Sequence, residues 1–268
     1  MMTALEEIKF RADSCSTMAN IRPAEHLPPS KKAFGYRICS GYSYGAYIYN
    51  TALGLDENAK THLINRFRLD SLAVDVCQED MLPSLENIYQ TKALLLEDVS
   101  EVSKKIISIA KTNTNEFVSH LCTILSCLRL EEDHKPYMDW FRKWEAKKYT
   151  SVLPGSSDAI EHLVNRDENN LVLTLDNMLL AHHKEAGNRH SNIYNSHAAF
   201  LSLAPYLILE LAEHLGMELR SRITQNKKTL KLGLSSPADF PETPKNHKMP
   251  IEIDYLTAKT NITSTATD

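Results

Sequence analysis

The sequence predicts an all-α fold, an irregular multi-helix array of antiparallel helix pairs with about eight to ten helices. Glycine is scarce, with 8 in 268 residues, and the segments between chain breakers are rich in Leu, Ala, Glu and Lys, which favour helix over sheet. Apolar residues recur at helical spacing, and sustained strand alternation is missing. The short links between the predicted segments make neighbouring helices antiparallel.

The first two helices are expected on either side of a proline-rich break. Residues 3–19 suit a helix, and the prolines up to Pro29 then force an extended chain. Residues 31–55 are rich in tyrosine and small side chains. This segment is interpreted as a helix with a weak point at Gly41, and β structure near residues 36–40 is an alternative.

Three further helices are predicted up to residue 111. Asp56 is a suitable N-cap for a helix that runs to about Val76. Pro83 stands where a proline at the first helical position belongs, and it opens a helix that reaches residue 97. Residues 100–111 form the next predicted helix, because their apolar side chains keep helical spacing.

The remaining helices are placed by caps and by prolines. Thr114 or Asn115 is predicted to cap a helix that ends near Leu128. Pro136 starts another helix, and Asp158 starts the C-terminal helices after a Pro-Gly-Ser-Ser break. No fixed-period repeat is visible, so a regular repeat array is not supported.

The whole pattern predicts a single helical domain over residues 1–223 and a largely irregular or disordered tail over residues 224–268. The tail is rich in Thr, Asn, Lys and Pro. Its last twelve residues, 257–268, hold too little apolar surface to order themselves alone.

Charge restricts the partners that can be expected. The net charge of −4 argues against general nucleic-acid binding, for which a basic stripe is typical. Residues 56–101 hold ten acidic and four basic side chains. Such a band is either a solvated helix face or a surface that steers a basic partner. The candidate partner-binding residues are Glu79, Asp80, Glu97, Asp98 and Glu101.

Cysteine usage and the terminal sequence predict a cytoplasmic protein. The five cysteines form an odd set without CxxC spacing, which is typical of reduced thiols. The first residues show neither the basic nor the apolar region of a signal peptide. The longest mainly apolar run, residues 198–209, is too short to span a bilayer, so no membrane partner is expected.

One segment satisfies the G-x-S-x-G pattern of a serine-hydrolase nucleophile elbow. It runs from Gly41 to Gly45 with Ser43 at its centre. The elbow needs a parallel sheet to present the serine, and too few residues precede it to build one. Small residues that let helices pack closely explain the pattern better, although a Ser43 hydrolase stays an alternative.

Five of the eleven histidines fall between residues 171 and 222, at positions 182, 183, 190, 197 and 214. A histidine-based metalloenzyme is therefore a further alternative. However, neither H-E-x-x-H nor paired E-x-x-H helices occur, and these spacings bring metal ligands to one face. Histidines near helix C-termini more often bond free carbonyls. We therefore expect no metal, no cofactor and no catalytic residue.

Two tryptophans, Trp140 and Trp144, stand one helical turn apart beside two basic residues. Such a ridge is either a binding surface, because Trp and Arg are common interface anchors, or a core contact.

Residues 171–222 contain two apolar helical stretches separated by a polar, histidine-bearing turn. The second stretch follows the pattern F-x-x-L-A-P-x-x-x-x-x-L-A-x-x-x-G from Phe200 to Gly216. This segment resembles the C-terminal part of the immunity protein 49 family of bacterial polymorphic toxin systems. The resemblance implies that the protein binds and neutralises a cognate toxin domain. A helical adaptor for another cellular protein is an alternative, and a homodimer is compatible with the sequence.

Overall fold

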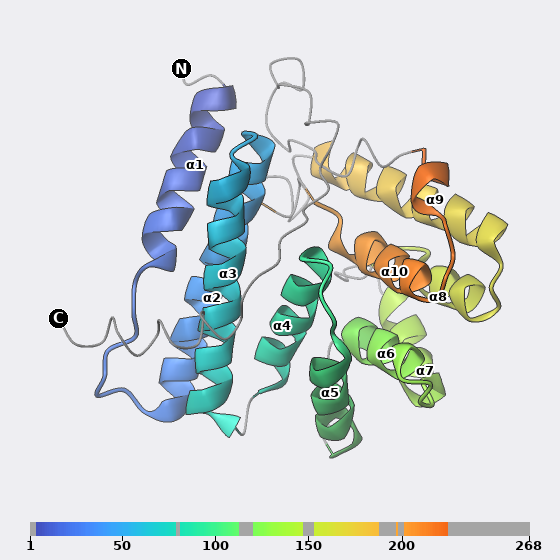
Figure 1. Cartoon of the computed structure of the whole chain (residues 1–268), viewed down its shortest axis with the longest axis horizontal. Helices are drawn as coiled ribbons and strands as arrows, with labels where there is room; N and C mark the ends of the chain where they lie inside the picture. Colours follow the sequence, from blue (N-terminus) through green and yellow to red (C-terminus); the bar gives the residue numbers. More distant parts are fainter. Residues whose placement is uncertain are drawn as a thin grey trace. The chain divides into compact units, whose positions relative to one another are not determined.

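The computed structural model describes residues 4–78, 81–112, 120–146, 153–187, 197 and 201–224. These ranges contain ten α-helices and no strand, which confirms the all-α prediction (Figure 1). The helices are α1 (Ala4–Ala19), α2 (Pro29–Ala52), α3 (Asp56–Val76), α4 (Leu82–Leu94), α5 (Ser100–Thr112), α6 (His120–Arg129), α7 (Lys135–Glu145), α8 (Ser156–Val164), α9 (Glu168–Gly187) and α10 (Leu203–His214), followed by the short 3-10 helix η3 (Arg220–Arg222).

The described chain divides into two compact units. The first unit ends at Asp98 and contains α1–α4, whereas the second begins at Val99 and contains α5–α10. The prediction of a single all-helical domain over residues 1–223 stays a prediction, because a division by packing does not show whether the two units fold and unfold together. The tail predicted over residues 224–268 lies, apart from Thr224, outside the described residues.

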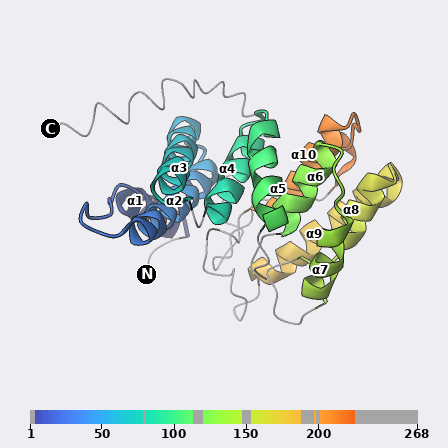
Figure 2. The same cartoon turned by 90° about the horizontal axis from the view of Figure 1, so that it is seen from below.

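In the first unit, α1, α2, α3 and α4 pack in chain order (Figure 2). α2 starts at Pro29, the first-turn proline position that removes no helical hydrogen bond. A turn of three residues then reverses the chain into α3, with Gly54 at a φ of 69°. Because this turn is so short, α2 and α3 form an antiparallel hairpin that buries side chains such as Tyr47 and Leu63.

The helix predicted over residues 31–55 is confirmed as α2, and the alternative of β structure at residues 36–40 is wrong, because those residues are helical. α2 continues without a break through Gly41, since one face of the helix is buried along the hairpin and packing outweighs weak helix propensity. The predicted N-cap of α3 was wrong. Asp56 is the first residue of α3, and its N-cap is Leu55, which makes no side-chain capping bond. The predicted caps Thr114 and Asn115 lie outside the described residues.

In the second unit, α10 packs against α6, α8 and α9, while α5 to α9 pack against their neighbours in the chain. α8 begins at Ser156, two residues before the predicted start at Asp158. The carboxylate of Glu145, on α7, accepts hydrogen bonds from the backbone nitrogens of Ser156 (2.8 Å) and Ser157 (3.1 Å). A residue outside the helix therefore satisfies its first N–H groups. Within the described ranges, no helix has the length and apolar character needed to cross a bilayer.

Candidate functional site

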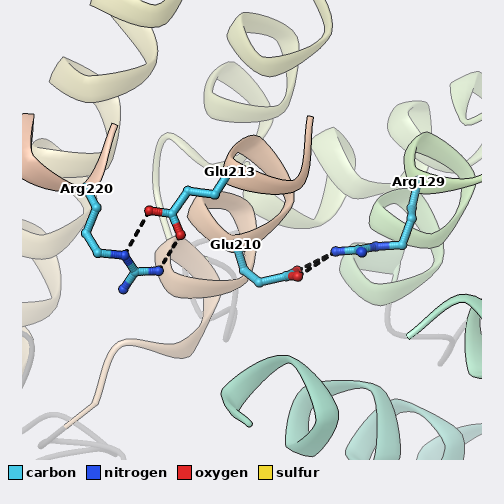
Figure 3. Close-up of polar contacts among 4 residues, drawn as sticks. All are labelled: Arg129, Glu210, Glu213 and Arg220. Atoms are coloured by element: carbon cyan, nitrogen blue, oxygen red, sulfur yellow. Dashed lines mark hydrogen bonds and ion pairs between the residues drawn. The ribbon is translucent and has the colours of Figure 1, made fainter. Parts of the chain in front are cut away.

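A buried ion pair joins α6 to α10 in the second unit (Figure 3). Nη2 of Arg129 lies 2.7 Å from Oε1 and 2.6 Å from Oε2 of Glu210, and both side chains are almost fully buried. Hydrogen bonds between oppositely charged groups are about twice as strong as those between neutral groups. The pair therefore fixes the orientation of α10 in a place where an unpaired charge would be costly.

A second pair lies at the C-terminal end of α10 and is more exposed (Figure 3). Arg220 donates from Nε (2.8 Å) and Nη2 (2.5 Å) to the two carboxylate oxygens of Glu213, which raises the pKa of Arg220. Its guanidinium lies 5.8 Å from the ring centre of Tyr206, and burial raises the pKa of Tyr206 to about 12. These contacts hold η3 against α10 and form one wall of an open surface depression.

The first unit contains a buried polar cluster between α2, α3 and α4. Asp70, fully buried on α3, accepts hydrogen bonds from Ser40 Oγ on α2 and, at 3.1 Å, from Asn87 Nδ2 on α4. Arg66, also buried on α3, donates from Nη2 to Asn87 Oδ1 (3.0 Å) and Gln90 Oε1 (2.8 Å). The cluster therefore ties all three helices together through hydrogen bonds.

Electrostatics in this cluster make Asp70 a weaker acid than an exposed aspartate. Burial raises the pKa of Asp70 to about 6, and the nearby positive charges of Arg66 and Arg37 only partly oppose this effect. The guanidinium of Arg66 lies 4.1 Å from the ring centre of Tyr44, and burial raises the pKa of this tyrosine to about 12. A cation over an aromatic face is a stabilising contact in a desolvated site.

The predicted acidic residues fall in different surroundings. Glu79 and Asp80 lie outside the described residues. Asp98, at the end of the first unit, and Glu101, in the first turn of α5, are exposed. Glu97 is only partly exposed, and one of its carboxylate oxygens is buried. Asp70, which also belongs to the acidic segment 56–101, is buried in the core. Fewer acidic side chains of this segment therefore face solvent than the sequence count indicates.

Ser43 lies in the middle of α2 and is fully buried. Its Oγ accepts a hydrogen bond of 2.7 Å from Asn65 Nδ2 on α3. A nucleophile elbow is a sharp strand-to-helix turn that exposes its serine, and this segment has neither property. Ser43 and Gly45 are both buried in the helix that packs on α3, whereas Gly41 is exposed.

The histidines of the C-terminal segment are dispersed. His182 is buried on α9, whereas His214 is exposed in the last turn of α10. His190 lies outside the described residues, as does the side chain of His183. No group of three His, Cys, Asp or Glu side chains with metal-site geometry occurs in the part of the chain that the structure describes.

The two tryptophans of α7 form a row of rings with a histidine of α6. The ring centres of Trp140 and Trp144 are 5.7 Å apart, and His120 lies 4.9 Å from Trp140. Burial lowers the pKa of His120, so its ring favours the neutral form. Both tryptophans are partly exposed.

Sequence reasoning missed the buried charges, although the sequence contains a signal for them. Arg66 and Asp70 fall on the same helical stripe as the buried residues Leu63 and Ala73, so two charged residues interrupt an otherwise apolar face. Glu210 is likewise an isolated acid in the apolar run of α10. A charged residue at a core position requires a buried partner, but its identity depends on the tertiary fold.

No family model, no curated protein and no solved structure matches this chain.

Proposed function

We propose that this protein binds a bacterial toxin domain and neutralises it by protein–protein contact. The observation that carries the proposal is the resemblance of residues 171–222 to the immunity protein 49 family. The segment contains the helices α9 and α10, in agreement with the two apolar helical stretches of the pattern. Leu211 and Ala212 of that pattern are fully buried, so these apolar positions serve the fold and leave partner recognition to other surfaces.

A rigid helical scaffold suits a neutralising protein. Binding costs less when little conformational freedom is lost, and tightly fixed helices are already ordered before the toxin arrives. The buried contacts of Arg129 with Glu210, and of Asp70 with α2 and α4, hold helices of each unit in fixed orientations. These contacts support the proposal because they fix the helix backbones that carry the exposed side chains before a partner binds.

The exposed acidic residues Asp98 and Glu101 are the part of the predicted acidic set that is best placed to attract a basic toxin. Surface charges act mainly on the association rate, and salt weakens their effect. Glu97 is less suitable for such a test, because one carboxylate oxygen is buried and its replacement would disturb the fold.

The test is a double charge reversal, Asp98→Lys with Glu101→Lys. It is studied with the product of the adjacent gene, because the resemblance implies that the toxin gene lies next to the gene of this protein. At low ionic strength we expect association to slow several-fold, with an unchanged helical circular dichroism spectrum and weaker protection of cells that express the toxin. The matched control is Glu132→Lys with Asp139→Lys, because these two acids are also exposed.

Two results would count against the proposal. Equal slowing by both double variants would show that only total charge matters and would remove Asp98 and Glu101 as the steering surface. Absence of any complex between the wild-type protein and the neighbouring gene product would remove the neutralising function itself.

A further inference from the structure

The outer face of α2 carries an apolar stripe that no described part of the first unit covers. Phe34 and Ile38 are 58% and 45% exposed, and Tyr42 continues the line as a partly exposed side chain one turn later. Gly41 lies beside them, and a Cβ placed there would have no atom within 4 Å. We call Phe34, Ile38, Gly41 and Tyr42 the α2 stripe.

The stripe is distinct from the face of α2 that belongs to the core. The side chains of Ser40, Ser43 and Tyr47 are buried on that other face. On one flank the preceding loop lies close to the helix, since Cys39 Sγ is 3.0 Å from the carbonyl oxygen of Ile21. Ile21 is itself 50% exposed and widens the apolar surface at this edge.

The charges in the chain segment that carries the stripe have one dominant sign. α2 contains no Asp or Glu in its 24 residues, and between residues 21 and 42 the chain holds four Lys or Arg and a single Glu. Lys31 is exposed on the same side of the helix as Phe34, and Arg22 is exposed in the loop. A two-fold symmetric dimer through this stripe would place like charges opposite each other, which disfavours a second copy as the occupant.

We propose that the α2 stripe is a docking surface for an acidic amphipathic helix of another protein. Residues at i, i+4 and i+8 of one helix form a straight ridge, and a helix laid along it presents anchors at i, i+3, i+4 and i+7. Gly41 leaves room for the partner backbone, and carboxylates beside the anchors meet the cations that flank the stripe. The surface is opposite in charge to Asp98 and Glu101, and the proposal is independent of toxin binding.

The test uses the full chain and a fluorescent helical peptide of about 18 residues, with leucines at these anchor positions and glutamates on both flanks. Fluorescence anisotropy is expected to show saturable binding that weakens with salt. Ile38→Glu is expected to weaken binding at least ten-fold, and Phe34→Ala and Lys31→Glu several-fold each. The matched control Leu173→Glu alters an equally exposed leucine on α9 and should leave affinity unchanged.

Circular dichroism establishes that each variant is folded. The proposal is overturned if a peptide with lysines in place of the glutamates binds as tightly, or if Ile38→Glu leaves the affinity unchanged. Preference of the chain for vesicles of phosphatidylglycerol over the acidic peptide would identify a membrane surface instead. A concentration-dependent dimer that Ile38→Glu abolishes would identify a second copy, and it too would overturn the proposal.

Discussion

Asp70 links a single buried proton to the stability of the first unit. Burial raises its pKa to about 6 from an ordinary value of 3.8, so the folded chain retains the proton to higher pH than the unfolded chain. The contribution of Asp70 therefore favours the folded state most strongly below about pH 4, and this advantage is lost as the pH rises to about 6. A difference of two pKa units corresponds to about 3 kcal/mol.

The variant Asp70→Asn removes this titration and keeps a side chain that forms hydrogen bonds. We expect the unfolding free energy of the wild type, relative to that of Asp70→Asn, to fall by about 2–3 kcal/mol between pH 4 and pH 7. Urea unfolding at a series of pH values measures this difference and cancels the titration of other groups. Parallel pH profiles for the two proteins would mean that folding does not raise the pKa of Asp70.

The pair of Arg129 and Glu210 permits a double-mutant cycle. Removing one partner leaves the other charge buried and uncompensated, so Arg129→Met and Glu210→Leu should each cost about 3–5 kcal/mol. The double variant replaces both charges by apolar groups and should cost clearly less than the sum. Urea unfolding of the wild type, the two single variants and the double variant gives the coupling free energy between the two side chains. Additive losses would show that the two side chains do not interact in solution.

At the scale of the element, variants of α10 show whether apolar residues at helical spacing in the sequence are buried in the core. Leu203, Leu207 and Leu211 repeat at helical spacing, but only the last two are fully buried, since Leu203 begins the helix and stays partly exposed. We expect Leu207→Ala and Leu211→Ala to lower the unfolding free energy by about 2–5 kcal/mol each. Leu203→Ala serves as the matched control and should cost less. Equal losses at all three positions would contradict this burial pattern.

Helix positions were predictable from the sequence where their cause is local. The spacing of apolar residues placed α3 and α5 within one or two residues of their observed bounds, because a helix repeats its buried face at a fixed interval. Helix starts were less predictable where the cause is tertiary. The cap of α8 comes from Glu145, on another helix, and no rule about neighbouring residues identifies such a partner.

For the molecule as a whole, exposed charges were predictable from the local sequence, whereas buried charges became apparent only in the tertiary structure. The exposure of Asp98 and Glu101 agrees with their position in a polar stretch, whereas the burial of Asp70 and Arg66 does not follow from composition. The α2 stripe was not predicted from the sequence for a similar reason. In a helix rich in tyrosine and small residues, periodicity alone does not distinguish the face that packs on a neighbour from the face left exposed.

The prediction of a single all-helical domain over residues 1–223 can be tested with the two tryptophans as probes. Trp140 and Trp144 are the two tryptophans of the chain, and both lie in the second unit. Leu63 is fully buried in the first unit, so Leu63→Ala should cost about 2–5 kcal/mol there. If the chain unfolds as one domain, this variant lowers the urea midpoint of tryptophan fluorescence as much as that of circular dichroism. A tryptophan midpoint unmoved by Leu63→Ala, beside a shifted dichroism curve, would show that the two units unfold separately.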